Sequence, residues 1–138
     1  MHDQVVGVVG ERDALEVHTA LGPGLLESAY QRCLRRELRL RSIQYASAVA
    51  LPVCYKGEPL DCGYRLDLLV AGCLIVEVKS VEKLLPIHKA QLLTYLRLAS
   101  ISAGLVINFN VSSLRHGARR RLLTEIAALS APPCERTD

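Results

Sequence analysis

Two charged residues two positions apart interrupt an apolar segment in the middle of the chain. Residues 73–80 read Cys-Leu-Ile-Val-Glu-Val-Lys-Ser, with Glu77 and Lys79 as the charged pair. Side chains alternate between the faces of a strand, so both charges point to one face, and Val76 and Val78 point to the other. Because an isolated buried charge is very costly, each must be paired or bound to a metal. Taken alone, an ordinary Glu–Lys or Asp–Lys salt bridge explains this pattern.

A second carboxylate, on the preceding strand, favours a metal site over a plain salt bridge. Asp67 lies among apolar residues, and a turn at Ala71-Gly72 brings the chain back toward Glu77. Two carboxylates that converge beside a lysine form a hard-oxygen site suited to Mg²⁺ or Mn²⁺.

Three more residues join the candidate set, namely Glu27, Gln91 and Tyr95. Gln91 and Tyr95 are spaced i and i+4 in a predicted helix and therefore share one helix face. Each of the three also has an ordinary structural explanation. Glu27 could be a charge at a helix start, and the other two could be a half-buried amphipathic pair.

The first part of the chain predicts two helices separated by a sharp break. Residues 11–21 form the first, which ends at Gly22-Pro23-Gly24. The second spans residues 25–41, where apolar side chains recur every four residues. The opposite side of this helix carries basic residues, which are either a solvated face or contacts for a nucleic-acid backbone. They are Arg32, Arg35, Arg36 and Arg39.

The rest of the chain predicts strands and helices around one sheet. Three strands form an antiparallel meander with a hairpin turn at residues 56–59, and a fourth strand follows a helix, so the sheet is mixed. These strands are expected over residues 47–55, 60–70, 73–80 and 103–109. The helices are expected over residues 86–99, with Pro86 in the first turn, and over residues 114–130. The expected class is α/β, with a central mixed sheet of about four strands flanked by helices.

Length and composition describe one globular domain. The 138 residues are 50% hydrophobic and 22% charged, and we expect a single domain over residues 1–130 with a C-terminal tail at residues 131–138. The net charge of +3 is too small to indicate nucleic-acid binding by itself. No apolar run approaches the ~20 residues that cross a bilayer. Residues 1–4 lack signal-peptide features, so a cytoplasmic protein is expected, with its five cysteines reduced.

The candidate residues occur in the motif order of a known family. The chain resembles the GxxExxY proteins, small members of the PD-(D/E)XK nuclease superfamily with a RecB-like motif order. The resemblance covers residues 14–121 and departs from the superfamily pattern at Leu66, where a proline usually stands. It rests on Gly24-Leu25-Leu26-Glu27-Ser28-Ala29-Tyr30, Leu60-Asp61-Cys62-Gly63-Tyr64-Arg65-Leu66-Asp67, Glu77-Val78-Lys79, Gln91-Leu92-Leu93-Thr94-Tyr95, Ile107-Asn108-Phe109-Asn110-Val111 and the basic stretch Arg115–Arg121.

The resemblance implies a restriction-endonuclease-like core and metal-assisted hydrolysis of phosphodiester bonds. It does not fix the substrate: DNA is expected ahead of RNA, and single or double strands and cleavage at an end or in the interior stay open. Asp67, Glu77 and the backbone carbonyl of Val78 would hold Mg²⁺, for which Mn²⁺ can substitute. Glu27 would be a further carboxylate, acting directly or through water. The cation would polarise a phosphate oxygen and lower the pKa of a bound water.

The resemblance also implies roles for the remaining candidates. Lys79 would position the attacking water or stabilise charge that develops on the phosphate. Gln91 would orient the scissile phosphate, and Tyr95 would pack or hydrogen-bond at the pocket rim. The arginines expected to contact substrate phosphates are Arg32, Arg36, Arg119 and Arg120.

Two other functions stay open at this stage. One is a catalytically weak or inactive nucleic-acid-binding or regulatory module on the same fold. The other is an unrelated interaction domain whose strand charges only form salt bridges. The small size and low net charge argue against one chain enclosing a long duplex, so a homodimer or a larger partner protein is a candidate source of specificity.

Overall fold

The computed structural model describes residues 2–114 and 118–122 of the chain. The helices of this part are α1 (His2–Leu21), α2 (Glu27–Leu40) and α3 (Pro86–Ala99). Its strands are β1 (Tyr45–Ala50), β2 (Val53–Tyr55), β3 (Glu58–Leu60), β4 (Arg65–Val70), β5 (Leu74–Lys79), β6 (Ala103–Asn108) and β7 (Ala118–Leu122).

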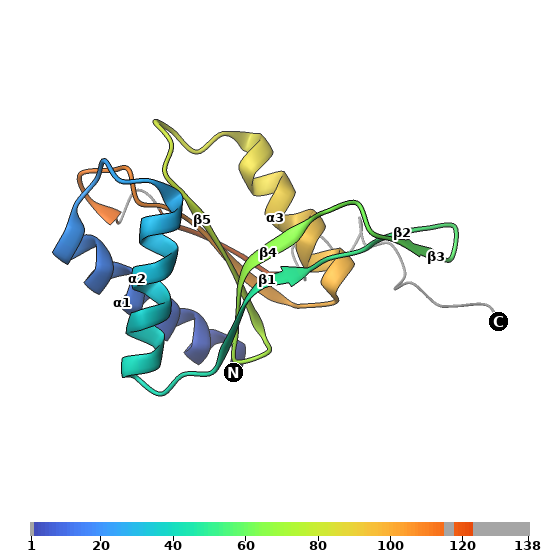
Figure 1. Ribbon diagram of the computed structural model, residues 1–138, viewed down its shortest axis with the longest axis horizontal. Helices are drawn as coiled ribbons and strands as arrows, with labels where there is room; N and C mark the ends of the chain where they lie inside the picture. The colour runs from blue at the N-terminus through green and yellow to red at the C-terminus, as the bar shows by residue number, and fades with distance from the viewer. Residues whose placement is uncertain (1, 115–117, 123–138) are drawn as a thin grey trace.

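The main sheet is mixed and has the order β1-β4-β5-β6-β7. Strands β1, β4 and β5 form the expected antiparallel meander. Helix α3 then carries the chain to β6, which pairs parallel to β5. Strands β2 and β3 form a separate hairpin that projects away from the main sheet (Figure 1). The α/β class with a mixed central sheet is therefore confirmed.

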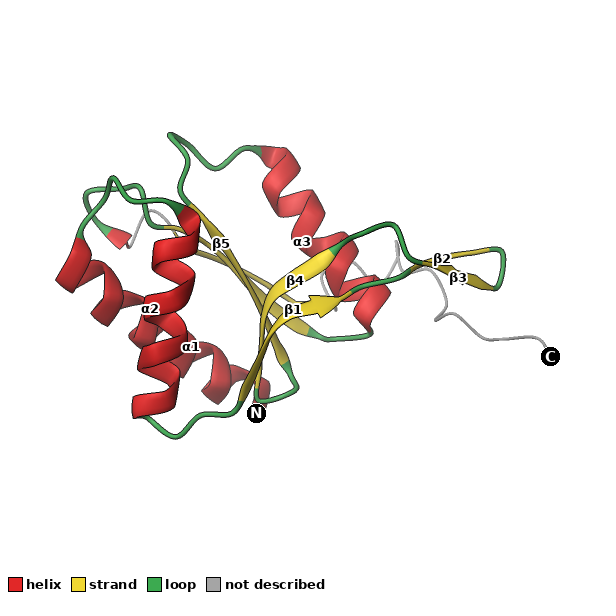
Figure 2. Ribbon diagram, viewed as in Figure 1, coloured by secondary structure: helices red, strands yellow, loops and turns green. Residues whose placement is uncertain are grey.

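Helices cover both faces of this sheet (Figure 2). On one face, α1 and α2 bury Val17, Leu34 and Leu38 against alternate residues of β4, β5 and β6. On the other face, α3 buries Leu92 and Leu96 against Ile75 of β5 and Val106 of β6. The odd-numbered positions of β5, which include Glu77 and Lys79, belong to the α3 face, while Val76 and Val78 belong to the α1 and α2 face.

Two of the predicted strands are divided in the structure. The segment 47–55 is broken at Leu51-Pro52, and the segment 60–70 is broken between Leu60 and Arg65. Proline has no N–H for a ladder bond, which explains the first break. At the second, the Gly63 N–H donates to Asp61 Oδ1 at 3.0 Å, and Gly63 has a φ of 82°. The tip of the β2–β3 hairpin lies at the predicted turn.

The helix expected over residues 114–130 is wrong at residues 118–122, which form β7. This strand pairs antiparallel with β6, from Ala103↔Leu122 to Ile107↔Ala118. Backbone pairing with a buried strand outweighs the modest helix preference of Ala, Arg and Leu. Residues 115–117 and 123–130 of the expected helix, and the expected tail at 131–138, lie outside the described residues.

Helix α1 begins at His2, nine residues before the predicted start. A Cβ on its Gly10 would lie 3.1 Å from Leu74 Cδ2, so the helix packs tightly on β5 there. Cys33, Cys62 and Cys73 are free thiols, but Cys54 is disulfide-bonded, so the expectation of reduced cysteines is wrong at that position. Spacing in sequence does not reveal which thiols meet in space. Among the described helices, none has the length and apolarity needed to cross a membrane.

Candidate active site

Strands β4 and β5 separate at the two acidic residues of the predicted site. Their antiparallel pairing stops at Leu68↔Val76, one position before Asp67 and Glu77 would face each other. On the other side of β4, Asp67 is also the one residue of that strand without a partner in β1. Ala48, which would face it, has a φ of 51°. The β4–β5 fork is our name for this opening at Asp67 and Glu77.

Carboxylate side chains take the place of ladder bonds at the β4–β5 fork. The backbone N–H of Val78 donates to Asp67 Oδ2 at 2.8 Å. The backbone N–H of Asp67 donates to Glu77 Oε1 at 3.3 Å. These two hydrogen bonds hold both carboxyl groups at the opening, where Glu77 is only 4% exposed.

The electrostatics at the fork disfavour two negative charges. Burial, and then the neighbouring Asp67 carboxylate, raise the pKa of Glu77 to about 9, and the Lys79 ammonium lowers it by a smaller effect. The ion pairs among the described residues join Arg41 to Asp13 and Glu37, and Arg65 to Asp61. None joins Lys79 to Asp67 or Glu77. The plain salt bridge that the sequence left open is therefore not formed.

Lys79 is held by a short chain of hydrogen bonds on the α3 face. Its Nζ donates to Gln91 Oε1 at 3.3 Å, and Gln91 Nε2 donates to the Tyr95 hydroxyl at 2.9 Å. Burial and the negative charge of Glu77 raise the pKa of Tyr95, so its hydroxyl stays neutral. The shared helix face predicted for Gln91 and Tyr95 is thus formed, and it points toward the end of β5.

The Gly24–Tyr30 motif forms the corner that leads into α2. The Tyr30 hydroxyl donates to Gly22 O at 2.6 Å and accepts from Leu25 N at 3.2 Å. Its ring stacks on Phe109 with centroids 4.6 Å apart. Gly24 has a φ of 102°, which favours glycine. This corner sets Glu27 as the first residue of α2, where a negative charge suits the helix dipole.

Glu27 reaches the end of β5 but not the pair of carboxylates. Glu27 Oε1 accepts from Ser80 N at 3.2 Å, and Ser80 Oγ donates to Leu25 O at 2.5 Å. In the described part of the chain, no three His, Cys, Asp or Glu side chains are grouped to hold a metal. The structure therefore brings Asp67 and Glu77 together and sets Glu27 beside Ser80, three residues beyond Glu77.

The family model of the PD-(D/E)XK nuclease superfamily matches residues 4–121. The chain belongs to this superfamily. Its members are usually hydrolytic nucleases, and the mixed sheet with its three helices is consistent with their restriction-endonuclease-like fold. Comparisons with curated proteins and with solved structures give no match.

Asn108 and Asn110 support the site, and the sequence alone had suggested no role for either residue. Asn108, at 1% exposure, accepts from Val81 N at 3.0 Å and donates to Val81 O at 2.9 Å. Asn110 Oδ1 accepts from Gly24 N at 3.1 Å. These contacts join the ends of β5 and β6 to the corner before α2. The available signal was the polar Asn108 at the end of an apolar strand.

The arginines predicted to contact phosphates lie in two elements, α2 and β7. Arg35 and Arg39 bond to β1, through Ser47 Oγ at 3.4 Å and the Tyr45 hydroxyl at 2.7 Å. Arg32 and Arg36 of the same helix are exposed. Arg119 and Arg120 lie in β7, opposite Val106 and Leu105 of β6, while Arg115 lies outside the described residues.

Proposed function

We propose that this protein is a divalent-cation-dependent nuclease that hydrolyses phosphodiester bonds of nucleic acid, with Mg²⁺ as its cation and DNA as its preferred substrate. The observation that carries the proposal is the pair of carboxylates at the β4–β5 fork. In the described part of the chain, no ion pair joins the carboxyl group of Asp67 or Glu77 to a cation, and Lys79 lies near enough to lower the pKa of Glu77. The corner formed by Gly24, Glu27 and Tyr30 supports a place among the GxxExxY proteins.

The donor set at the fork fits a hard divalent cation. Asp67, Glu77 and the Val78 carbonyl would hold Mg²⁺ or Mn²⁺, with Glu27 contributing through water from its place at Ser80. When bound, the cation polarises a phosphate oxygen and lowers the pKa of a water. Burial and the neighbouring Asp67 raise the pKa of Glu77, so Glu77 would have to lose its proton to serve as a ligand.

The two polar residues on the α3 face would act on the phosphate itself. Lys79 supplies a fixed positive charge where negative charge develops on the phosphate oxygens. Gln91 orients that ammonium through its carbonyl oxygen. Its amide nitrogen carries two N–H groups, of which one donates to Tyr95. The second would donate to a phosphate oxygen and hold the scissile group beside Lys79.

The test is a cleavage assay with labelled single- and double-stranded DNA and RNA, in Mg²⁺, in Mn²⁺ and in EDTA. We expect cleavage of DNA with either cation, none in EDTA, and recovery when excess Mg²⁺ is added back. Binding of a strand without cleavage in any cation would instead support the binding or regulatory module on the same fold. No cleavage and no binding of any of the four substrates would contradict both functions.

The exposed Arg32 and Arg36 are proposed to contact backbone phosphates, together with Arg119 and Arg120 of β7. Each phosphate contact contributes roughly 0.7–0.9 to the slope of log affinity against log salt. Replacement of Arg32 and Arg36 by alanine should flatten that slope, measured by titration of a labelled strand. Lys56→Ala, at the exposed hairpin turn, is the matched loss of a surface charge and should leave the slope unchanged.

A further inference from the structure

A pocket of about 580 Å³ opens beside Lys79 and Gln91 on the α3 face. This volume is in the range of pockets that hold small organic groups. Its walls come from α3, from the segment before β4 and from β2. Besides Lys79 and Gln91, aromatic and aliphatic side chains line it, namely Tyr64, Tyr95, Ile87 and Leu98.

Two of these apolar side chains are exposed. Tyr64 is 45% exposed and Ile87 is 66% exposed. The Tyr64 ring lies against Tyr95 with centroids 6.1 Å apart and planes at 61°, an edge-type contact that orients it at the pocket. Tyr64 stands three residues before Asp67, so one short segment supplies both an aromatic wall and a carboxylate of the proposed active site.

The polar groups of the pocket suit a planar, hydrogen-bonding ligand next to a negative group. The described lining residues include no carboxylate, and Lys79 supplies a positive charge. Gln91, Thr94 and His88 offer hydrogen-bond donors and acceptors along one face of α3. Lys79 and Gln91 belong both to this pocket and to the proposed phosphate site, so a ligand can occupy the two together.

We propose that this pocket binds one unstacked nucleobase of the strand whose phosphate lies at Lys79. The inference rests on the proposed nuclease function and names its substrate class. A base has a flat face for Tyr64 and polar edges for the helix residues, and its own phosphate provides the adjacent negative charge. Bases in an intact duplex are stacked and paired, so the pocket selects single strands and unpaired ends.

The test measures binding rather than cleavage. The affinity of the protein for fluorescein-labelled strands of about 12 nucleotides is measured in EDTA by anisotropy. The probes are a single-stranded DNA, the same strand with abasic sites, and a blunt hairpin duplex. We expect the single strand to bind most tightly. Tyr64→Ala should weaken it by about 5- to 100-fold, because one base–aromatic stack is lost, and should leave the abasic strand unaffected.

Two variants separate stacking from loss of structure. Tyr64→Phe keeps the ring and should retain wild-type affinity. Tyr55→Ala removes an exposed ring of the β2–β3 hairpin that does not line the pocket, so it should also retain wild-type affinity. Equal affinity of Tyr64→Ala and wild type for the single strand overturns the proposal. So does an equal loss on the abasic strand, or absence of binding to every probe.

The nuclease and the pocket can fail separately. Binding that depends on Tyr64, with no cleavage in Mg²⁺ or Mn²⁺, supports the pocket and contradicts the nuclease. Cation-dependent cleavage by a Tyr64→Ala protein with unchanged affinity and unchanged preference for single strands supports the nuclease and overturns the pocket.

Discussion

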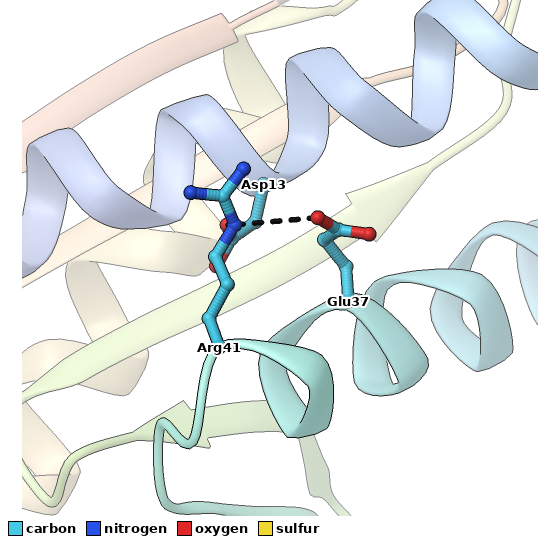
Figure 3. A network of polar contacts seen from close by, with 3 residues as sticks. All are labelled: Asp13, Glu37 and Arg41. Carbon is cyan, nitrogen blue, oxygen red and sulfur yellow. Dashed lines mark hydrogen bonds and ion pairs between the residues drawn. The ribbon is translucent and has the colours of Figure 1, made fainter.

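Two buried acidic groups on opposite faces of the sheet differ in the charge that faces them. On the α1 and α2 face, Asp13 is fully buried, and Arg41 Nε lies 2.6 Å from its Oδ1 and 3.2 Å from Glu37 Oε1 (Figure 3). On the α3 face, Glu77 is 4% exposed, but the charge that faces it is another carboxylate, Asp67.

Burial raises the pKa of both acids, so the direction of the pKa does not tell them apart. At Asp13 the guanidinium of Arg41 works against the rise. At Glu77 the charge of Asp67 adds to it. At Asp13 the cation of Arg41 faces the buried acid, whereas at Glu77 the facing group is a second acid. The partner, more than the burial, separates a structural acid from a candidate catalytic one.

The largest difference should be in catalysis. Asp67→Ala, Glu77→Ala and Lys79→Ala should each reduce cation-dependent cleavage by at least about 100-fold, because each removes a proposed metal ligand or a charge that stabilises the transition state. Asp13→Asn, at the other buried acid, should keep near wild-type activity per folded molecule. The measurement is the rate of cleavage of a labelled DNA strand. Cleavage by the Asp67→Ala protein at the wild-type rate would contradict the catalytic role assigned to Asp67.

The second difference should be in stability. Arg41→Ala leaves Asp13 buried without its cation and should lower the free energy of unfolding by on the order of 3 kcal/mol, measured by urea denaturation. The control is Arg65→Ala, which breaks the exposed pair with Asp61 and should have a much smaller effect, because water screens that pair. Equal effects of the two substitutions would remove the structural role assigned to Asp13 and Arg41.

The third difference is in the pH dependence of stability without added metal. The pKa of Glu77 is raised in the folded protein, so between its ordinary value of 4.5 and about 9 the folded state keeps a proton that the unfolded state has lost. Its contribution to stability is complete below the ordinary pKa and is lost as the pH rises through that window.

Glu77→Gln keeps an acceptor for the Asp67 N–H and cannot ionise. It should therefore raise the melting temperature in EDTA at pH 8 and flatten the fall of stability between pH 5 and 8, as followed by thermal denaturation. A lower melting temperature than wild type at pH 8, with the same pH dependence, would mean that Glu77 has a cationic partner.

The smallest expected effect is the response to metal. A cation that binds only the folded protein stabilises it by mass action. Millimolar Mn²⁺ should therefore raise the wild-type melting temperature by a few degrees, which corresponds to about 1 kcal/mol. Glu77→Gln should abolish this shift, while Arg65→Ala should keep it. A wild-type melting temperature that does not change with Mn²⁺ would contradict the proposed site.

Much of the site follows from periodicity. Strand alternation placed Glu77 and Lys79 on one face, and helical spacing placed Gln91 and Tyr95 together, because both arguments depend only on local backbone geometry. The meander and the crossover helix followed from the order of elements. The roles assigned to these residues stay predictions.

The unpredicted features all depend on contacts between distant segments. β7 forms because residues 118–122 find an unpaired edge of β6. The bracing by Ser80 and Asn108 requires the ends of β5 and β6 to meet the loop before α2. The β4–β5 fork depends on where two strands diverge, which residue types do not reveal, since Asp67 and Glu77 would also have been compatible with an unbroken ladder.

The β4–β5 fork makes two backbone amides sensitive to the state of the site. In most of the sheet an amide proton is bonded to a carbonyl of the next strand, which no ligand disturbs. The amides of Val78 and Asp67 are bonded instead to the carboxyl groups of Asp67 and Glu77. Protonation, cation binding or substitution at these carboxyls changes the acceptor directly. The chemical shifts and hydrogen-exchange rates of these two amides therefore form a built-in reporter of site occupancy that needs neither a substrate nor a label.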